Sequence, residues 1–164
     1  MDLKTLIPLI STVVGGFLAV TGGFFASYFM QKLNKSHDKK QLIRDKLEQA
    51  YLLTIQLENW LQSQMSDMLF IKDNETEKIS NPSNHIFMLV KCYGETKSSQ
   101  LADQLSTSLE NFRKSSFNYF KEAHETGKKP SETTFLAVGE PFEMSRRLTT
   151  ELRDNIEKLI HKNT

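Results

Sequence analysis

The sequence is poor in the residues that make cross-links, tight turns or a strong overall charge. It has one cysteine, Cys92, in 164 residues, which excludes a disulfide within the chain and a four-cysteine zinc site. Four prolines and seven glycines are too few for a β-protein with many tight turns. The net charge at pH 7 is +1, so no overall field favours nucleic acid. These features fit a helical protein and a reducing compartment.

The sequence also lacks the motifs of common enzyme chemistry. It contains no phosphate-binding loop, no dinucleotide-binding glycine motif and no G-x-S-x-G motif. The histidines His37, His85, His124 and His161 do not pair at the spacing of metal ligands, and we expect each to be solvated or to cap a helix. We expect Cys92 in the core. We therefore predict no enzyme, no metal, no cofactor and no small-molecule substrate; a site gathering His85, Cys92 and a carboxylate is the alternative.

One segment has the composition of a base-stacking surface. It combines the aromatic residues Phe112, Phe117, Tyr119 and Phe120 with the basic residues Arg113, Lys114 and Lys121. Bases can stack on aromatic side chains between cations. At helical spacing, however, such aromatics are more often core residues with a solvated flank, and the overall charge is balanced. We therefore predict that the protein does not bind nucleic acid.

Residues 6–30 form the one long stretch without a charged side chain. As a helix rising about 1.5 Å per residue, this stretch is roughly 37 Å long, and the hydrocarbon core of a bilayer is about 30 Å thick. We therefore predict a transmembrane helix at 6–30, a short extracytoplasmic end at 1–5 and a cytoplasmic helical domain at 31–164. A cleaved signal peptide and a buried core helix are the alternatives, and both are usually shorter.

The flanking charges predict the orientation of this helix. Only Lys4 precedes the uncharged run. The basic residues that follow it are Lys32, Lys35, Lys39, Lys40, Arg44 and Lys46. The positive-inside rule then predicts a single-pass protein of the cell inner membrane with its carboxyl-terminal domain in the cytoplasm. The same side chains can contact anionic headgroups, so membrane lipid is a predicted partner; setting topology alone is the alternative.

The uncharged run has one smooth face and one bulky face. At about 100° per residue, its small side chains share an arc of roughly 160°. They are Ser11, Thr12, Gly15, Gly16, Ala19, Gly22, Gly23, Ala26 and Ser27. Small residues let two helix backbones approach closely in lipid, so this face is predicted to pack on a helix of a second copy or of a different membrane protein. The alternative is that glycine is simply frequent in spanning helices.

The rest of the sequence predicts an all-α antiparallel bundle of three long helices and one short helix. The helices are expected at about 38–71, 82–93, 98–126 and 131–161, with an exposed loop at 72–84. Helix caps are expected at Asn81, at Ser98 or Ser99, and at Ser131, and helix stops at Gly94 and Gly127. Pro141 predicts a kink or a break in the last helix.

Apolar residues at three- and four-residue steps predict the core of this bundle. In the first helix the stripe runs through Ile43, Leu47, Ala50, Thr54, Leu57, Leu61 and Met68. In the third it runs through Leu101, Leu105, Leu109, Phe112, Phe120 and Ala123. In the last it runs through Phe135, Val138, Phe142, Leu148, Leu152, Ile156 and Leu159.

Two stretches resemble a known type of protein. The first, residues 13–53, reads VVGGFLAVTGGFFASYFMQKLNKSHDKKQLIRDKLEQAYLL. It resembles the start of many uncharacterised bacterial single-pass membrane proteins, in which a glycine-rich amino-terminal anchor leads into a basic and then amphipathic cytoplasmic helix. The second reads MLVKCYGETKSSQLADQLSTSLENF and is similar to a later segment of that group. The resemblance implies a bacterial, membrane-anchored helical protein and brings no functional residues.

Together these patterns predict a membrane-anchored helical module that works by protein–protein contact at the inner face of a bacterial membrane. The small-residue face would associate laterally, and the loop at 72–84 or a groove at Pro141 would bind a partner. The alternative is an oligomeric membrane effector that forms pores or disrupts the membrane, in a defence or toxin system.

Overall fold

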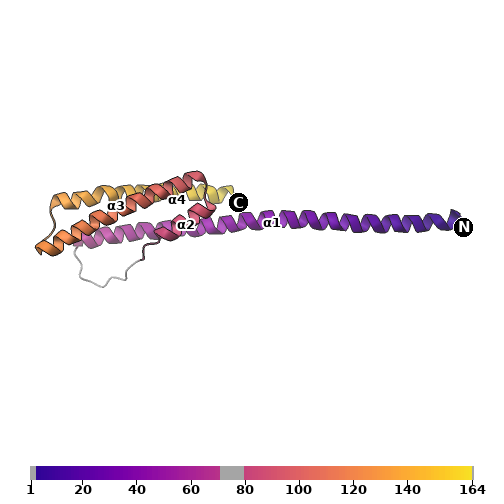
Figure 1. Cartoon of the computed structure of the whole chain (residues 1–164), viewed down its shortest axis with the longest axis horizontal. Coiled ribbons are helices and arrows are strands. Elements are labelled where there is room, and N and C mark those ends of the chain that lie inside the picture. The colour runs from indigo at the N-terminus through magenta and orange to yellow at the C-terminus, as the bar shows by residue number, and fades with distance from the viewer. Residues whose placement is uncertain (1–2, 71–79, 164) are drawn as a thin grey trace. The chain divides into compact units, whose positions relative to one another are not determined.

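The computed structural model describes the backbone of residues 3–70 and 80–163 and the side chains of residues 23–69 and 80–163. These residues form helices and no strand, which confirms the predicted all-α class. The helices are α1 (Leu3–Phe70), α2 (Ser83–Tyr93), α3 (Thr96–Thr126) and α4 (Glu132–Lys162) (Figure 1). Three are long and one is short, as predicted.

The chain divides into two compact units, residues 1–42 and residues 43–164. The first unit is the amino-terminal part of α1, and the second contains the rest of α1 with α2, α3 and α4. This division reflects only which residues contact one another within the chain, so it does not test where a membrane would lie. The predicted start of a cytoplasmic domain at residue 31 therefore stays a prediction.

A search of the residues with described side chains found no helix with the length and hydropathy needed to cross a membrane. The predicted span at 6–30 falls mainly on residues 6–22, whose side chains lie outside the described part of the structure. The transmembrane helix therefore stays a prediction.

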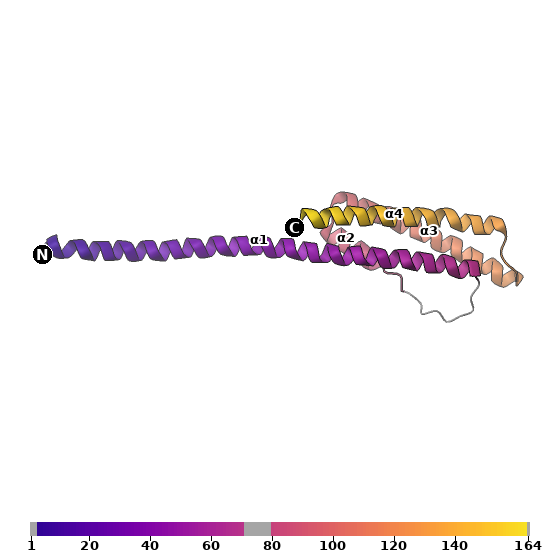
Figure 2. The ribbon, with the colours of Figure 1, turned by 180° about the vertical axis from the view of Figure 1, so that it is seen from behind.

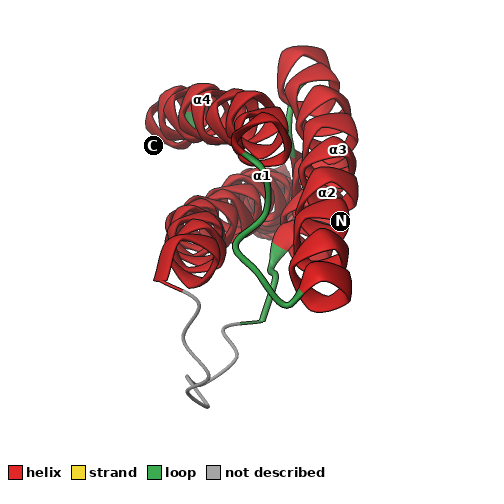
Figure 3. Ribbon diagram, turned by 90° about the vertical axis from the view of Figure 1, so that its left-hand side faces the viewer, coloured by secondary structure: helices red, strands yellow, loops and turns green. Residues whose placement is uncertain are grey.

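In the second unit, successive helices run in opposite directions (Figures 1 and 2). The short α2 is antiparallel to the carboxyl-terminal part of α1, and α3 and α4 form a long antiparallel hairpin. Seen along the bundle, α1, α3 and α4 are grouped around one interior (Figure 3). This is the antiparallel bundle that the short connections predict.

The core of the second unit comes from one face of each helix. In α1 the buried residues are Leu47, Ala50, Thr54, Leu57, Leu61 and Met68, as the periodicity predicts. Buried apolar residues of the other helices include Ile86, Leu89, Val90, Leu101, Leu105, Phe112, Val138, Leu152 and Ile156. Phe112 connects three helices, since its ring centroid lies 6.3 Å from that of Trp60 in α1 and 5.9 Å from that of Phe142 in α4.

Several predicted helix ends are confirmed. The side chain of Ser131 accepts a hydrogen bond from the Thr134 N–H at 3.3 Å and so caps α4. Gly127 follows α3 with a φ of 61°, the left-handed conformation that favours glycine at a helix end. Gly94 follows α2, and its N–H donates to the Val90 carbonyl. The predicted cap at Asn81 is wrong, because the N-cap of α2 is Pro82 and no side chain among the described residues makes a capping hydrogen bond there. Asn81 Oδ1 instead accepts from the Ser83 N–H at 2.9 Å and forms a turn just before the helix.

The predicted cap at Ser98 or Ser99 is wrong. The α3 helix begins at Thr96, after Glu95. Ser98 lies inside α3 and is fully buried, and its hydroxyl donates to Asn155 Oδ1 of α4 at 2.6 Å. A small hydroxyl side chain is favoured at both kinds of position, so the sequence alone did not separate a cap from a contact between helices.

The predicted helix break at Pro141 is also wrong, because α4 continues through it from Glu132 to Lys162. Proline removes one hydrogen bond, the one to the carbonyl four residues earlier, at Ala137. Ala137 is exposed, so water can reach that carbonyl. Packing along the whole length of α4 then keeps the helix continuous at the cost of a single internal bond.

Two predicted core residues lie at the surface. Cys92 is exposed, because it lies about 120° around α2 from the buried Ile86. Phe120 is 44% exposed, whereas its neighbour Tyr119 is 1% exposed. The Tyr119 hydroxyl donates to the Met68 carbonyl of α1 at 3.0 Å. This bond stabilises Tyr119, rather than Phe120, in the interior beside the end of α1.

Candidate functional site

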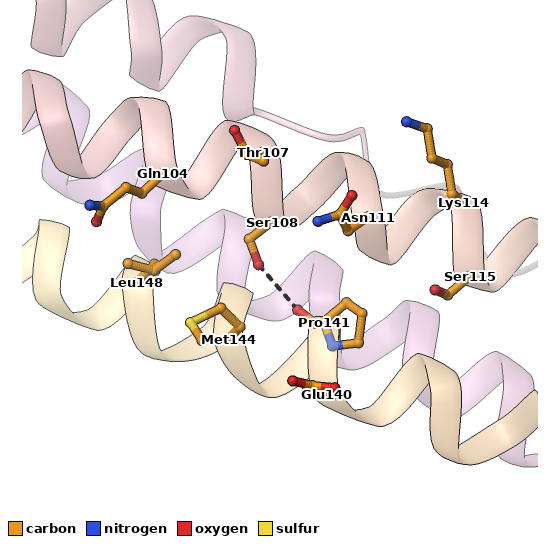
Figure 4. A pocket seen from close by; sticks show the side chains of 10 residues that line it. All are labelled: Gln104, Thr107, Ser108, Asn111, Lys114, Ser115, Glu140, Pro141, Met144 and Leu148. Carbon is orange, nitrogen blue, oxygen red and sulfur yellow. Dashed lines mark hydrogen bonds between the residues drawn. The ribbon is translucent and has the colours of Figure 1, made fainter. Parts of the chain in front are cut away.

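The clearest groove on the second unit lies between α3 and α4, beside Pro141 (Figure 4). Its volume is about 710 Å³. Its α3 residues are Gln104, Thr107, Ser108, Asn111, Lys114 and Ser115, and its α4 residues are Glu140, Pro141, Met144 and Leu148. The sequence predicted a groove left by a kink at Pro141, and the structure places a groove there beside a continuous α4.

Small hydroxyl side chains lie between α3 and α4 beside this groove. The Ser108 and Ser145 hydroxyl oxygens are 2.9 Å apart, and both residues are buried. The Ser108 hydroxyl also reaches the Pro141 carbonyl at 3.4 Å, and the Thr149 hydroxyl donates to the Ser145 carbonyl at 2.8 Å. This pair of serines joins α3 to α4 beside the groove. It was not predicted from the sequence, since buried serines follow no simple pattern.

The chemistry of the groove suits binding rather than catalysis. Its polar groups are the amides of Gln104 and Asn111, the hydroxyls, and the oppositely charged Lys114 and Glu140 on facing helices, while Met144 and Leu148 add apolar surface. No histidine or cysteine lines it. A serine nucleophile needs an adjacent base, and here the Ser108 hydroxyl contacts another hydroxyl and a carbonyl.

The predicted catalytic alternative is not assembled in the described part of the chain. His37, His85, His124 and His161 are all exposed, as expected for solvated histidines. Neither His85 nor Cys92 lines the groove at Pro141. Among the residues searched, no three His, Cys, Asp or Glu side chains come together in a way that could hold a metal ion.

A second polar cluster joins the end of α3 to the start of α4. Glu122 accepts hydrogen bonds from the Ser131 N–H at 2.9 Å and from the Thr134 hydroxyl. These donors favour the charged carboxylate, so the Thr134 bond first and the Ser131 bond second lower the pKa of Glu122. Because Ser131 also caps α4, this cluster fixes the turn between the two helices.

The other candidate site is the described part of the first unit, residues 23–42 of α1. Every side chain in this range is exposed. Four aromatic residues are prominent there: Phe24 is 78% exposed, Phe25 66%, Tyr28 59% and Phe29 60%. Apolar surface on this scale marks a binding site for a protein or a membrane.

The predicted small-residue face is described only in part. Gly23, Ala26 and Ser27 are exposed, and a Cβ built on Gly23 would meet no atom within 4 Å. The other members of the face, Ser11, Thr12, Gly15, Gly16, Ala19 and Gly22, lie outside the residues with described side chains. Their packing therefore stays a prediction. The same is true of the loop at 72–84 up to residue 79.

The basic residues near this segment fall into two groups. Lys32, Lys35, Lys39 and Lys40 are exposed, and none has a carboxylate partner within the described residues. By contrast, Arg44 pairs with Glu48 at 2.7 Å, and this hydrogen bond raises the pKa of Arg44.

Lys46 lies beyond the first unit. Its ammonium group contacts Gln49 Oε1 at 3.4 Å, and the residue is half-buried. The four lysines of the first unit thus differ from Arg44 and Lys46, which each contact a neighbouring side chain.

Comparisons of the chain with protein-family models, with curated proteins and with solved structures found no match. The function must therefore be inferred from the chain itself.

Proposed function

We propose that the protein is a single-pass, membrane-anchored helical module that binds other proteins at the inner face of a bacterial membrane. Residues 6–30 would cross the membrane, and the bundle from Ile43 onward would stand on the cytoplasmic side. The bacterial setting rests on the sequence resemblance, and the orientation rests on the basic residues after the uncharged run.

The observation that carries the proposal is the aromatic surface at the end of the uncharged run. Phe24, Phe25, Tyr28 and Phe29 are all more than half exposed on a helix that nothing else in its unit covers. In water this surface is unfavourable, at about 25 cal/mol per Å² of apolar area. Aromatic residues followed by lysines are typical of the boundary between a membrane and water. A lipid bilayer is thus the environment that this segment fits best.

The groove at Pro141 supports the binding part of the proposal. It offers hydrogen-bonding groups and apolar surface on a rigid pair of helices, and it lies on the bundle rather than on the anchor. A peptide segment with a polar stripe and one or two apolar side chains would match its lining. Met144→Asp would place a charge in the groove and should weaken partner binding without unfolding the bundle, since Met144 is 46% exposed.

The anchor is tested by cross-linking the full chain in membranes. Single cysteines replace Gly15, Ala19 or Gly23 in a Cys92→Ser background, because Cys92 is exposed and would react. Phe24→Cys is the matched control, since it is next to Gly23 but on the bulky face. Cross-linking of two chains at the small-residue positions and not at the control would support a homo-oligomer.

The remaining outcomes separate the alternatives. Cross-links only to another membrane protein would identify that protein as the lateral partner. Self-cross-linking accompanied by leakage of vesicle contents would favour the membrane effector, and bulky residues at Gly15 and Gly22 should then abolish the leakage. Equal reaction at Gly23 and Phe24 would contradict a packing face.

A further inference from the structure

We propose that one face of α1, formed by Lys32, Lys35 and Lys39, binds anionic phospholipid headgroups, while the opposite face of the same helix turns toward the lateral partner. This inference rests on the proposed membrane anchor. It specifies the charge of the lipid that is bound and which side of the helix faces that lipid. The proposed anchor specifies neither.

The three lysines lie on one side of the helix. At about 100° per residue, Lys32, Lys35 and Lys39 fall within an arc of roughly 60°. Lys40, the next residue along the chain, points about 100° away from Lys39. Lys32, Lys35 and Lys39 therefore form a basic stripe along one side of the helix.

The stripe continues the aromatic face of the preceding turns. Measured from Lys32, the aromatic residues Phe24, Phe25, Tyr28 and Phe29 lie within about 80° on either side. Gly23 and Ala26 lie more than about 100° away, on the opposite side. If the small residues pack against a neighbouring helix, the aromatic residues face acyl chains and the lysines beneath them face headgroups.

The charges on the stripe have no partner in the described part of the chain. Lys32, Lys35 and Lys39 are exposed and form no ion pair there. The nearest acidic residue in the sequence, Asp38, lies about 120° from Lys32 and about 60° from Lys35 around the helix, and it forms no ion pair with either among the described residues. Flexible lysines reaching from an interfacial helix suit the phosphates of a lipid surface, because each makes a point-charge contact without fixed geometry. Anionic lipid is therefore the occupant that matches both the charge and the aromatic face.

The test uses the full-length chain with Cys92→Ser, reconstituted into vesicles of phosphatidylcholine alone or with roughly a third of phosphatidylglycerol. A fluorophore is attached to Ser36→Cys, on the lysine side, or to His37→Cys, on the far side. Both positions are exposed and adjacent in sequence. Quenching by a lipid with a nitroxide on its headgroup then reports which side of the helix contacts the surface.

We expect stronger quenching at position 36 than at position 37 in the anionic vesicles. The difference should vanish in phosphatidylcholine alone and near 1 M salt, where the screening length is only about 3 Å. Lys39→Gln should weaken the contact about fivefold, as for one lysine near an anionic surface. Lys40→Gln is the matched control, because it removes the same charge from a different face, and it should have a much smaller effect.

Equal quenching at the two positions in anionic vesicles, or equal effects of Lys39→Gln and Lys40→Gln, would overturn the inference. A difference that persists without anionic lipid would also overturn it and would show that the contact with the surface does not depend on lipid charge. Carbonate extraction of the same vesicles separates this inference from the anchor. If carbonate releases the protein but the lipid-dependent difference in quenching is still present, the lysine stripe is supported and the membrane-spanning helix is contradicted.

Discussion

The side chains of residues 23–42 and the described side chains of the second unit, residues 43–69 and 80–163, are satisfied in different ways. In the second range, apolar residues such as Leu57 and Leu61 are fully buried, and several cations pair with carboxylates, as Arg153 does with Glu58 at 2.7 Å. In the first range, every side chain is exposed and the four lysines have no partner among the described residues. The second range therefore has a core of its own, whereas the first presents aromatic and basic groups on a helix without one.

The largest expected effect comes from removing the first unit. Deletion of residues 1–42 should abolish membrane association and leave a folded helical domain, because the second unit contains its own core. Circular dichroism should show a helical spectrum and a cooperative thermal transition, and fractionation should find the domain in the supernatant. An unfolded product would show that the bundle depends on the deleted segment.

The next effect tests burial within the second unit. Leu57→Ala should lower the free energy of unfolding by about 2–5 kcal/mol, because Leu57 is fully buried and its truncation leaves a cavity. Leu52→Ala on the same helix is the control. Leu52 is 60% exposed, so its truncation should change the free energy of unfolding by less than about 0.5 kcal/mol. Urea denaturation measures both, and similar losses would contradict the assigned core face.

A smaller effect is expected where α3 closes the end of α1. Tyr119→Phe removes the hydroxyl that donates to the Met68 carbonyl and leaves that acceptor without this partner. The free energy of unfolding should fall by about 1 kcal/mol. Phe120→Leu is the control, because Phe120 is at the surface and its change should be smaller. A larger loss for Phe120→Leu would mean that the two aromatic residues are exchanged.

The smallest effect depends on pH. The pKa of Glu122 is lowered in the folded protein by its bonds from Thr134 and Ser131, so its carboxylate stabilises the fold above the ordinary pKa of about 4.3. This contribution is lost as the pH falls through the lowered pKa. The stability difference between the native chain and Glu122→Gln should therefore be constant near neutral pH and shrink in acid. Urea denaturation of both chains across the pH range measures this difference, and a difference that stays constant into acid would contradict the role of the two bonds to Glu122.

The sequence predicted the fold where periodicity and caps agree. The buried stripe of α1, the cap at Ser131 and the stop at Gly127 all follow from local rules. Cys92 was misplaced because residue type was given more weight than its position on the helix. Tyr119 was missed from the predicted stripe because its burial depends on a carbonyl of α1, fifty-one residues away in sequence.

The candidate groove was predicted at the correct place, from a kink at Pro141. The structure has a continuous α4 there, and beside the groove Ser108 of α3 contacts Ser145 of α4, which lie opposite each other only in the folded bundle. No sequence pattern pairs two serines on different helices. The basic residues that follow the uncharged run, in contrast, were predicted from the sequence because they lie within a few turns of one helix. The aromatic residues Phe24, Phe25, Tyr28 and Phe29 were not singled out as a site.

The most direct test of the proposed anchor is alkaline carbonate extraction of bacterial membranes that contain the full-length chain. The protein should stay in the membrane pellet after carbonate and leave it only with detergent. The chain without residues 1–42 should be in the supernatant from the start. Release of the full-length protein by carbonate alone would contradict a membrane-spanning helix at residues 6–30.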